Sequence, residues 1–162
     1  MVQIGVVGAS EALPRECEWA EEVGRELARR GIVVLCGGLG GVMEAAAKGV
    51  VSGGGIAVGI LPGPDRSEAN AFVRVTVATD MGHARNIVLV RSCDGLIAIG
   101  GGYGTLSEIA IALKTGIPVV SLGSWEAGLP VIVARDPQDA VRLVLKAVSR
   151  RREGTVGRDG MI

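Results

Sequence analysis

The chain has little that would suit a metal centre, a disulfide framework or an aromatic binding surface. Its 162 residues include one His, three Cys, two Trp, one Tyr and one Phe. Cys17, Cys36 and Cys93 are odd in number and form no CxxC pair, so we expect no structural zinc and reduced, mostly buried thiols in a cytoplasmic protein. No apolar run reaches about 18 residues, and the N-terminus resembles no signal peptide, so no membrane span is predicted.

The charge and glycine content favour an ordinary globular domain. Seventeen basic residues balance seventeen acidic ones, which gives no basic surface for nucleic acid. The 26 glycines stand in short clusters between apolar runs, unlike a collagen-like or disordered chain. We expect one Rossmann-like domain over residues 1–152. Residues 153–162, EGTVGRDGMI, lack periodicity and are expected to form a loose C-terminal tail.

Short apolar segments alternate with longer helical patterns along the chain. Strands are predicted at residues 3–9, 32–38, 55–62, 71–79, 95–101, 117–123 and 129–134. Helices are predicted at residues 14–31, 41–54, 82–93, 105–116 and 136–151. Most of these strands are continuously apolar, which is typical of a sheet covered by helices on both faces. The pattern therefore predicts an α/β fold with a doubly wound, mainly parallel Rossmann-like sheet.

A motif of the form GGxGxxxE occurs twice, each time where a predicted strand gives way to a helix. It reads GGLGGVME at 37–44 and GGYGTLSE at 101–108. Because ligands of open α/β sheets bind at the carboxyl ends of strands, two such loops suggest an anion held by backbone N–H groups. Tight turns are the alternative reason for the glycines. The candidate binding residues are Gly8, Gly37, Gly38, Gly40, Gly41, Gly101, Gly102, Tyr103, Gly104 and Thr105.

Two common glycine-loop chemistries do not fit. A dinucleotide fingerprint needs G-x-G-x-x-G, but the first strand lacks it, and Met43 and Thr105 take the place of the third glycine in the later loops. No GK[ST] is present, which excludes a P-loop. What remains is a phosphate or carboxylate cradle built from backbone amides and a helix dipole.

Two charged residues near these loops have structural as well as functional interpretations. Thr105 and Glu108 have the spacing of a capping box, in which Thr105 begins the helix and Glu108 reaches back to it. Glu44 lacks such a partner, because Gly41 stands at the capping position. Arg85 is suited to clamp a phosphate, but it and His83 also fit a solvated helix start.

The segments GGYGTLSE and HARN resemble the LOG-type proteins, a Rossmann-like group long mislabelled lysine decarboxylases. The enzymes of that group cleave the N-glycosidic bond of nucleoside 5′-monophosphates. The resemblance implies that Arg85 and Glu108 are catalytic and that the loop from Gly101 to Thr105 binds phosphate. The chain departs from the group's PGGxGTxxE and MHERK signatures, with Gly100 for proline and Asn86 for lysine.

The segments GILPGPDRSEAN, GHARNIVLV and EIAIALKTGIPVVSLG more closely resemble the molybdenum cofactor carrier proteins. That resemblance implies a bound pterin phosphate at the same sheet edge, with Asp65 and Arg66 beside it, although PGPDRS also fits a rigid turn. Tyr103 is the best-placed residue for stacking on a ring, but it also suits a surface position. LOG-like proteins are dimers, so the resemblance further implies a homodimer or a higher homo-oligomer.

Three functions therefore remain open from the sequence. The leading one is a cytoplasmic protein that binds a phosphorylated nucleotide- or pterin-like molecule and requires no other cofactor. The second is a nucleoside 5′-monophosphate phosphoribohydrolase, and the third a structural or regulatory oligomer whose loops are only turns. Lysine decarboxylation is not expected, because the only lysines, Lys48, Lys114 and Lys146, lie on predicted helices away from the glycine loops.

Overall fold

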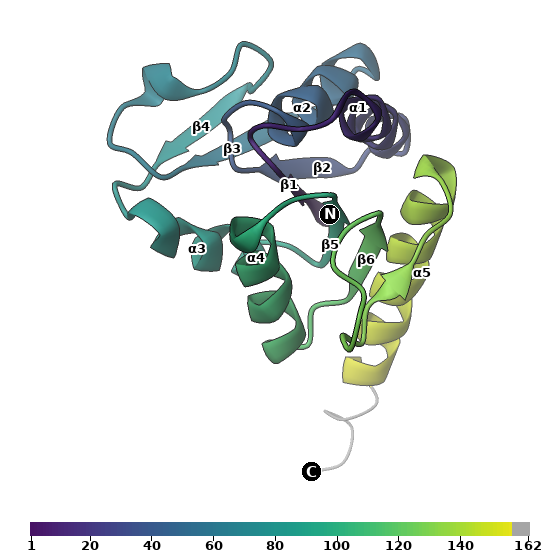
Figure 1. Ribbon diagram of the computed structural model, residues 1–162. Coiled ribbons are helices and arrows are strands. Elements are labelled where there is room, and N and C mark those ends of the chain that lie inside the picture. Colours follow the sequence, from purple (N-terminus) through teal and green to yellow (C-terminus); the bar gives the residue numbers. More distant parts are fainter. Residues whose placement is uncertain (157–162) are drawn as a thin grey trace.

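The computed structural model describes residues 1–156, which form one sheet flanked by helices (Figure 1). Neighbouring strands are all parallel, in the order β4-β3-β2-β1-β5-β6-β7. The strands are β1 (Gln3–Gly8), β2 (Val33–Cys36), β3 (Ala57–Leu61), β4 (Val75–Ala78), β5 (Gly95–Ile99), β6 (Val119–Leu122) and β7 (Ile132–Val133). The α-helices are α1 (Pro14–Arg29), α2 (Val42–Ser52), α3 (Arg85–Arg91), α4 (Tyr103–Lys114) and α5 (Pro137–Val156), with short 3-10 turns η1 (Arg66–Glu68) and η2 (Gly82–Ala84).

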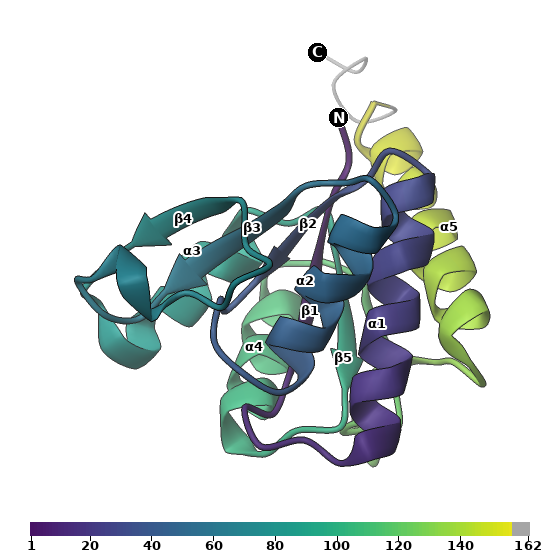
Figure 2. The same ribbon diagram turned by 90° about the horizontal axis from the view of Figure 1, so that it is seen from above.

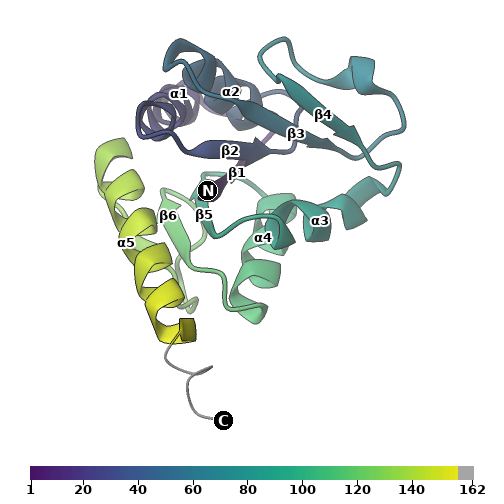
Figure 3. The same cartoon turned by 180° about the vertical axis from the view of Figure 1, so that it is seen from behind.

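Helices cover both faces of the sheet. Figures 2 and 3 show α1, α2 and α5 on one face and α3 and α4 on the other. Alternate residues of β1 divide between the two apolar clusters: Ile4 and Val6 join the first, and Val7 joins Leu89 of α3 and Ile109 of α4 in the second. Because the central strands are buried on both faces, their sequences are continuously apolar. The doubly wound, Rossmann-like α/β prediction is confirmed.

The direction in which the chain winds changes between β1 and β5, which lie side by side. From β1 the chain moves outward through β2 and β3 to β4, and then returns through α3 to β5 on the other side of β1. The register pairs Gly8 with Ile99, so the carboxyl ends of these two strands are level. Loops leaving this point diverge over opposite faces of the sheet, which leaves a crevice between them.

The capping box predicted at Thr105 is wrong. The helix α4 begins at Tyr103, its N-cap is Gly102, and no side chain caps it. The first intrahelical bond runs from the Leu106 N–H to the Gly102 carbonyl, at 3.0 Å. Thr105 therefore lies inside the first turn, and Glu108 projects from the second turn. The helix starts two residues earlier than expected because two glycine residues, Gly100 at φ 53° and Gly101 at φ 92°, turn the chain immediately after β5.

The end of the domain also differs from its prediction. The helix α5 continues to Val156, so residues 153–156, expected in the loose tail, are helical. Residues 157–162, the rest of that tail, lie outside the described residues. The predicted final strand shrinks to the two residues of β7, while α5 packs against α1 and β6. No helix in the described part of the chain is long and apolar enough to cross a membrane.

Candidate functional site

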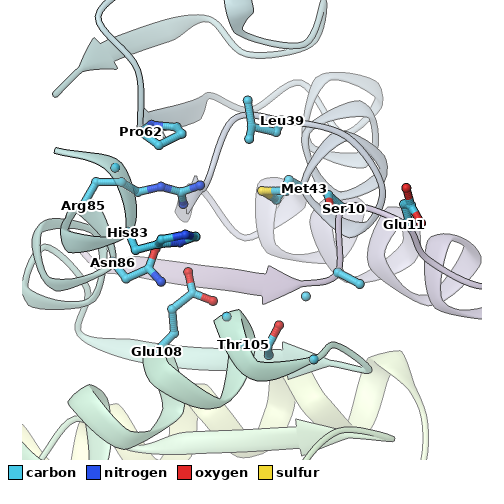
Figure 4. Close-up of a pocket in the computed structure, with 15 residues that line it drawn as sticks. Ser10, Glu11, Leu39, Met43, Pro62, His83, Arg85, Asn86, Thr105 and Glu108 are labelled. Atoms are coloured by element: carbon cyan, nitrogen blue, oxygen red, sulfur yellow. The ribbon is translucent and has the colours of Figure 1, made fainter. Parts of the chain in front are cut away.

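A cavity of about 580 Å³ lies at the carboxyl edge of the sheet, where the winding direction changes. Its walls come from the segments that follow β1, β2, β3, β4 and β5, so residues distant in the sequence meet there. Figure 4 shows these side chains around the cavity. The lining residues are Gly8, Ala9, Ser10, Glu11, Leu39, Met43, Pro62, Gly82, His83, Arg85, Asn86, Gly102, Gly104, Thr105 and Glu108. This volume falls within the range of small-molecule sites.

Arg85 reaches the cavity from the first residue of α3, and it is unusually poor in partners for a buried arginine. The residue is only 8% exposed, and its Nε is buried without a hydrogen-bond partner. Burial lowers the pKa of the guanidinium below its usual value, and the nearby Glu108 carboxylate opposes this shift. A cation at a helix N-terminus is also disfavoured by the helix dipole. The fold therefore keeps Arg85 at a cost in free energy that an anionic ligand would offset.

Glu108 enters the same cavity from α4, below Arg85 and His83 in the view of Figure 4. It is 6% exposed, and burial raises the pKa of its carboxyl to about 7, against the opposing effect of Arg85. No ion pair joins Glu108 to Arg85 among the described residues. The carboxyl can therefore both donate and accept a proton near neutral pH.

Gly37, at the end of β2, makes room for the guanidinium. A Cβ at this position would collide with Nη1 of Arg85 and with Sδ of Met43. The adjacent Cys36 is fully buried, and burial raises the pKa of its thiol to about 11, so the thiol is neutral. Gly37 thus acts through close packing behind Arg85, rather than by lining the cavity.

Asn86 connects the two helices that carry the charged residues. Its Nδ2 donates to Oγ of Ser107 at 3.0 Å, and that hydroxyl donates to the Gly104 carbonyl at 2.6 Å. Asn86 is 7% exposed and also lines the cavity. This chain of hydrogen bonds fixes the start of α3 against the start of α4. Asn86, which stands where the LOG signature has lysine, therefore has a hydrogen-bond partner within the protein, Ser107.

The two GGxGxxxE loops, alike in sequence, are not equivalent in structure. The second contributes Gly102, Gly104, Thr105 and Glu108 to the cavity, whereas the first contributes Leu39 and Met43 instead of its glycines. Glu44 is exposed and lies outside the lining. At the first loop, a Cβ on Gly41 would meet the carbonyls of Ala9 and Ser10. Close packing against the β1–α1 loop therefore explains much of the first motif.

Several candidate binding residues lie apart from the cavity. Asp65 and Arg66 are exposed at the η1 turn, where Asp65 accepts from the Ser67 N–H at 2.8 Å. Tyr103 is 84% exposed and stacks on Trp125, with ring centroids 6.0 Å apart. Of the predicted glycines, Gly8 lines the cavity beside Gly102 and Gly104. Those that do not line it are Gly37, Gly38, Gly40, Gly41 and Gly101.

Several residues that line the cavity are not among the site residues predicted from the sequence. Ser10 and Glu11 follow β1, and Pro62 follows β3. Their position directly after strands that meet at one edge was a usable signal, but none belongs to a glycine motif. The exposed His83 does line the cavity, beside Arg85 and Asn86.

The fold and this cavity define a Rossmann-like α/β protein with a ligand-sized site at the switch point of its sheet. A family model described as the SLOG cluster4 family matches residues 1–150. The chain belongs to this family, and its resemblance to LOG-type and molybdenum cofactor carrier proteins is confirmed.

Three relatives illustrate the range of similar proteins. An uncharacterized protein of Archaeoglobus fulgidus is 48% identical over 147 residues, which are 91% of this chain and 97% of that protein. The solved molybdenum cofactor binding protein of Rippkaea orientalis is 34% identical, with a TM-score of 0.86 over 91% of this chain and 97% of that one. A probable cytokinin riboside 5′-monophosphate phosphoribohydrolase of Oryza sativa subsp. japonica is 36% identical over 94 residues, covering 56% of this chain and 42% of that protein.

Proposed function

We propose that the chain binds a phosphorylated small molecule, nucleotide- or pterin-like, in the cavity at the carboxyl edge of the sheet. The observation that carries this proposal is the buried Arg85 side chain, which lines the cavity and whose Nε–H donates to no acceptor among the described residues. A buried charge without a partner is costly unless a ligand supplies one. The carrier-like relatives of similar length favour the same interpretation.

The phosphate would bind at the start of α4. The first N–H groups of a helix have no intrahelical acceptor, and the helix dipole favours an anion there. Gly102, Gly104 and Thr105 line the cavity at this point, so their amides and the Thr105 hydroxyl are available. Arg85 supplies a second positive group, and Glu108 faces donor groups on the remainder of the ligand.

The test is a binding titration with inorganic phosphate, ribose 5-phosphate, nucleoside 5′-monophosphates and pterin phosphates. Wild-type protein should bind at least one phosphate ester and gain thermal stability from it. Arg85→Gln should weaken that binding at least tenfold, because it removes a charge-assisted contact. The matched control is Arg91→Gln, which removes an exposed arginine from the same helix. Absence of binding to every phosphate ester would contradict the proposal and favour a purely structural role.

A second candidate, hydrolysis of nucleoside 5′-monophosphates, is favoured by one observation. Burial raises the pKa of Glu108 to about 7 in the same cavity that holds Arg85. In such a reaction the glycosidic C–N bond breaks, its electron pair leaves with the base, and water adds to C1′. The Glu108 carboxylate would stabilise the cationic sugar and take the proton from water.

Release of free base from a panel of nucleoside 5′-monophosphates distinguishes catalysis from binding. If the wild type releases base and Glu108→Gln does not, the protein is a phosphoribohydrolase. If ligands bind but no base is released, the binding function stands alone. Glu44→Gln, at the exposed glutamate of the other motif, controls for the change of residue type.

We further propose a cytoplasmic homodimer. The family resemblance supports an oligomer, and apolar side chains remain exposed at Val75 and Val77 of β4 and at Ile87 of α3. The apolar residues of α2 are largely buried in the core and are not free to form an interface. Light scattering on wild type and Ile87→Asp tests the assembly, with a change to monomer expected if α3 contributes.

A further inference from the structure

The glycine loop between β5 and α4 is held by two side chains that lie outside the ligand cavity. Oγ of Ser124 donates to the Gly100 carbonyl at 2.5 Å. Nε1 of Trp125 donates to the Gly102 carbonyl at 3.2 Å. Both donors come from the loop after β6, and neither lines the ligand cavity. Two carbonyls of the loop are therefore fixed by side chains more than twenty positions away in the sequence.

Fixing these carbonyls also fixes the amides that follow them. In a planar trans peptide, the C=O of one residue and the N–H of the next point in opposite directions. A Gly100 carbonyl held by Ser124 therefore turns the Gly101 N–H away from Ser124. The Gly102 carbonyl accepts both from the Leu106 N–H of α4 and from Trp125, so these two donors together set the direction of the Tyr103 N–H. The Tyr103 N–H is the first amide of α4, one of those without an intrahelical acceptor.

The loop needs this support because its own backbone is permissive. Gly100 at φ 53° and Gly101 at φ 92° lie in a region where glycine is free to reorient. The Tyr103 ring stacks on Trp125, which adds a third contact between the two loops. Ser124 is itself held, because its N–H donates to Oγ of Ser121 at 3.1 Å. An anion site made of amides gains affinity when the amides are oriented before the ligand arrives.

We propose that Ser124 and Trp125 are positioning residues for phosphate binding: by holding the carbonyls of Gly100 and Gly102 they fix the backbone that leads into α4, and with it the cavity-lining Gly102 and Gly104. This inference rests on the proposed function, since it assumes that the start of α4 receives the phosphate. It gives Tyr103 a role on the outer side of the loop, as a stacking partner for Trp125. It also makes the β6–β7 loop part of the binding machinery, although that loop contributes no cavity wall.

The experiment measures the dissociation constants of inorganic phosphate and ribose 5-phosphate by calorimetry at 25 °C. Ser124→Ala removes one donor, and Trp125→Phe removes the other while keeping a ring for Tyr103. Each variant should weaken both ligands by roughly three- to tenfold, the effect of one hydrogen bond. Ser124→Thr, which restores a hydroxyl, should recover the affinity. Ser92→Ala is the matched control for Ser124→Ala, because its hydroxyl donates within its own helix and the residue lies outside the cavity lining.

Thermal unfolding of the same variants separates positioning from simple stabilisation. If Ser124 and Trp125 only stabilise the fold, the melting temperature falls while the dissociation constants at 25 °C stay unchanged, and the inference is overturned. A second outcome is that wild type binds phosphate, Arg85→Gln does not, and the Ser124 and Trp125 variants bind like wild type. In that case the phosphate site stands and only the positioning role of Ser124 and Trp125 is overturned. If wild type binds neither ligand, the proposed phosphate site fails first and the inference with it.

Discussion

The Arg85 guanidinium packs against Gly37, so closely that a Cβ on the glycine would collide with Nη1. Gly37 follows β2, whereas Arg85 begins α3, after β4. The two residues meet at the carboxyl edge of the sheet. Gly37 has no positive φ, so this glycine is needed for space and not for backbone conformation. The position of the buried cation is thus set by a residue that the ligand need not touch.

Gly37→Ala should displace Arg85 and weaken phosphate-ester binding. The added methyl meets Nη1 and the Met43 sulfur, so either the guanidinium moves or Met43 repacks. We expect a roughly tenfold loss of affinity and a loss of about 1–3 kcal/mol in the free energy of unfolding, typical of overpacking. Calorimetric titration and urea denaturation measure the two effects.

Gly40→Ala is the control, because the nearest atom to its Cβ is the Ser10 carbonyl oxygen, at 3.5 Å. It should leave both the affinity and the stability close to wild type. Unchanged ligand affinity in Gly37→Ala would mean that Met43 gives way and that Arg85 is not positioned by this contact.

Glu108→Gln should stabilise the ligand-free protein at alkaline pH. The folded-state pKa of about 7 lies above the ordinary value of 4.5, so between these pH values the folded protein binds more protons than the unfolded chain. The free energy of unfolding therefore falls as the pH rises from about 4.5 to about 7. Replacing the carboxyl removes that cost, a gain of at most about 3 kcal/mol at pH 8 that shrinks towards pH 5.

Urea denaturation of both proteins at pH 5 and pH 8 measures this difference. Glu44→Gln, at an exposed glutamate outside the cavity, is the control for the change of residue type. An equal effect of Glu108→Gln at both pH values would show that Glu108 has an ordinary pKa in the folded protein. Such a result would also weaken its candidacy as a group that exchanges a proton near neutrality.

The fold was predictable because its determinants are local and repeated. Every strand and α-helix in the described chain lies close to a segment that apolar periodicity selected, and continuous apolar strands indicated burial on both faces. The start of α4 was missed because Thr105 and Glu108 satisfy the capping-box pattern, while the actual start at Tyr103 is set by the glycine turn before it. The helical extension to Val156 was missed because its sequence has no helical periodicity.

The candidate site was predictable only where its residues follow strands in recognisable motifs. Arg85, Glu108 and the second glycine loop meet as expected, whereas the first loop resembles the second in sequence and differs in position. Contacts such as Gly37 with Arg85 depend on tertiary packing, which leaves no periodic signal in the sequence. The same is true of the hydrogen bond from Trp125 to Gly102.

The Asn86–Ser107 hydrogen bond should show measurable coupling. Asn86→Ala should reduce the free energy of unfolding by about 1–2 kcal/mol, and Ser107→Ala should reduce it by about 1 kcal/mol. Because both remove the same 3.0 Å contact, the double variant should lose less than the sum, with a coupling of about 0.5–1 kcal/mol. Ser92→Ala is the control for Ser107, since its hydroxyl bonds only within its own helix. Additive losses would mean that the two side chains act independently.

Gly100→Ala should lower the free energy of unfolding by more than the usual penalty for a side chain at a positive φ. Gly100 at φ 53° and Gly31 at φ 71° share the backbone penalty for a side chain, about 1–2 kcal/mol, but only Gly100 has a neighbour in the way. A Cβ there meets the Glu16 carboxylate, which accepts the Leu13 N–H at 2.9 Å, so moving Glu16 sacrifices that bond at the start of α1. We expect Gly100→Ala to lose about 1 kcal/mol more than Gly31→Ala in urea denaturation. This excess should disappear when both glycine variants are compared in a Glu16→Ala background, and its persistence there would contradict the role assigned to Glu16.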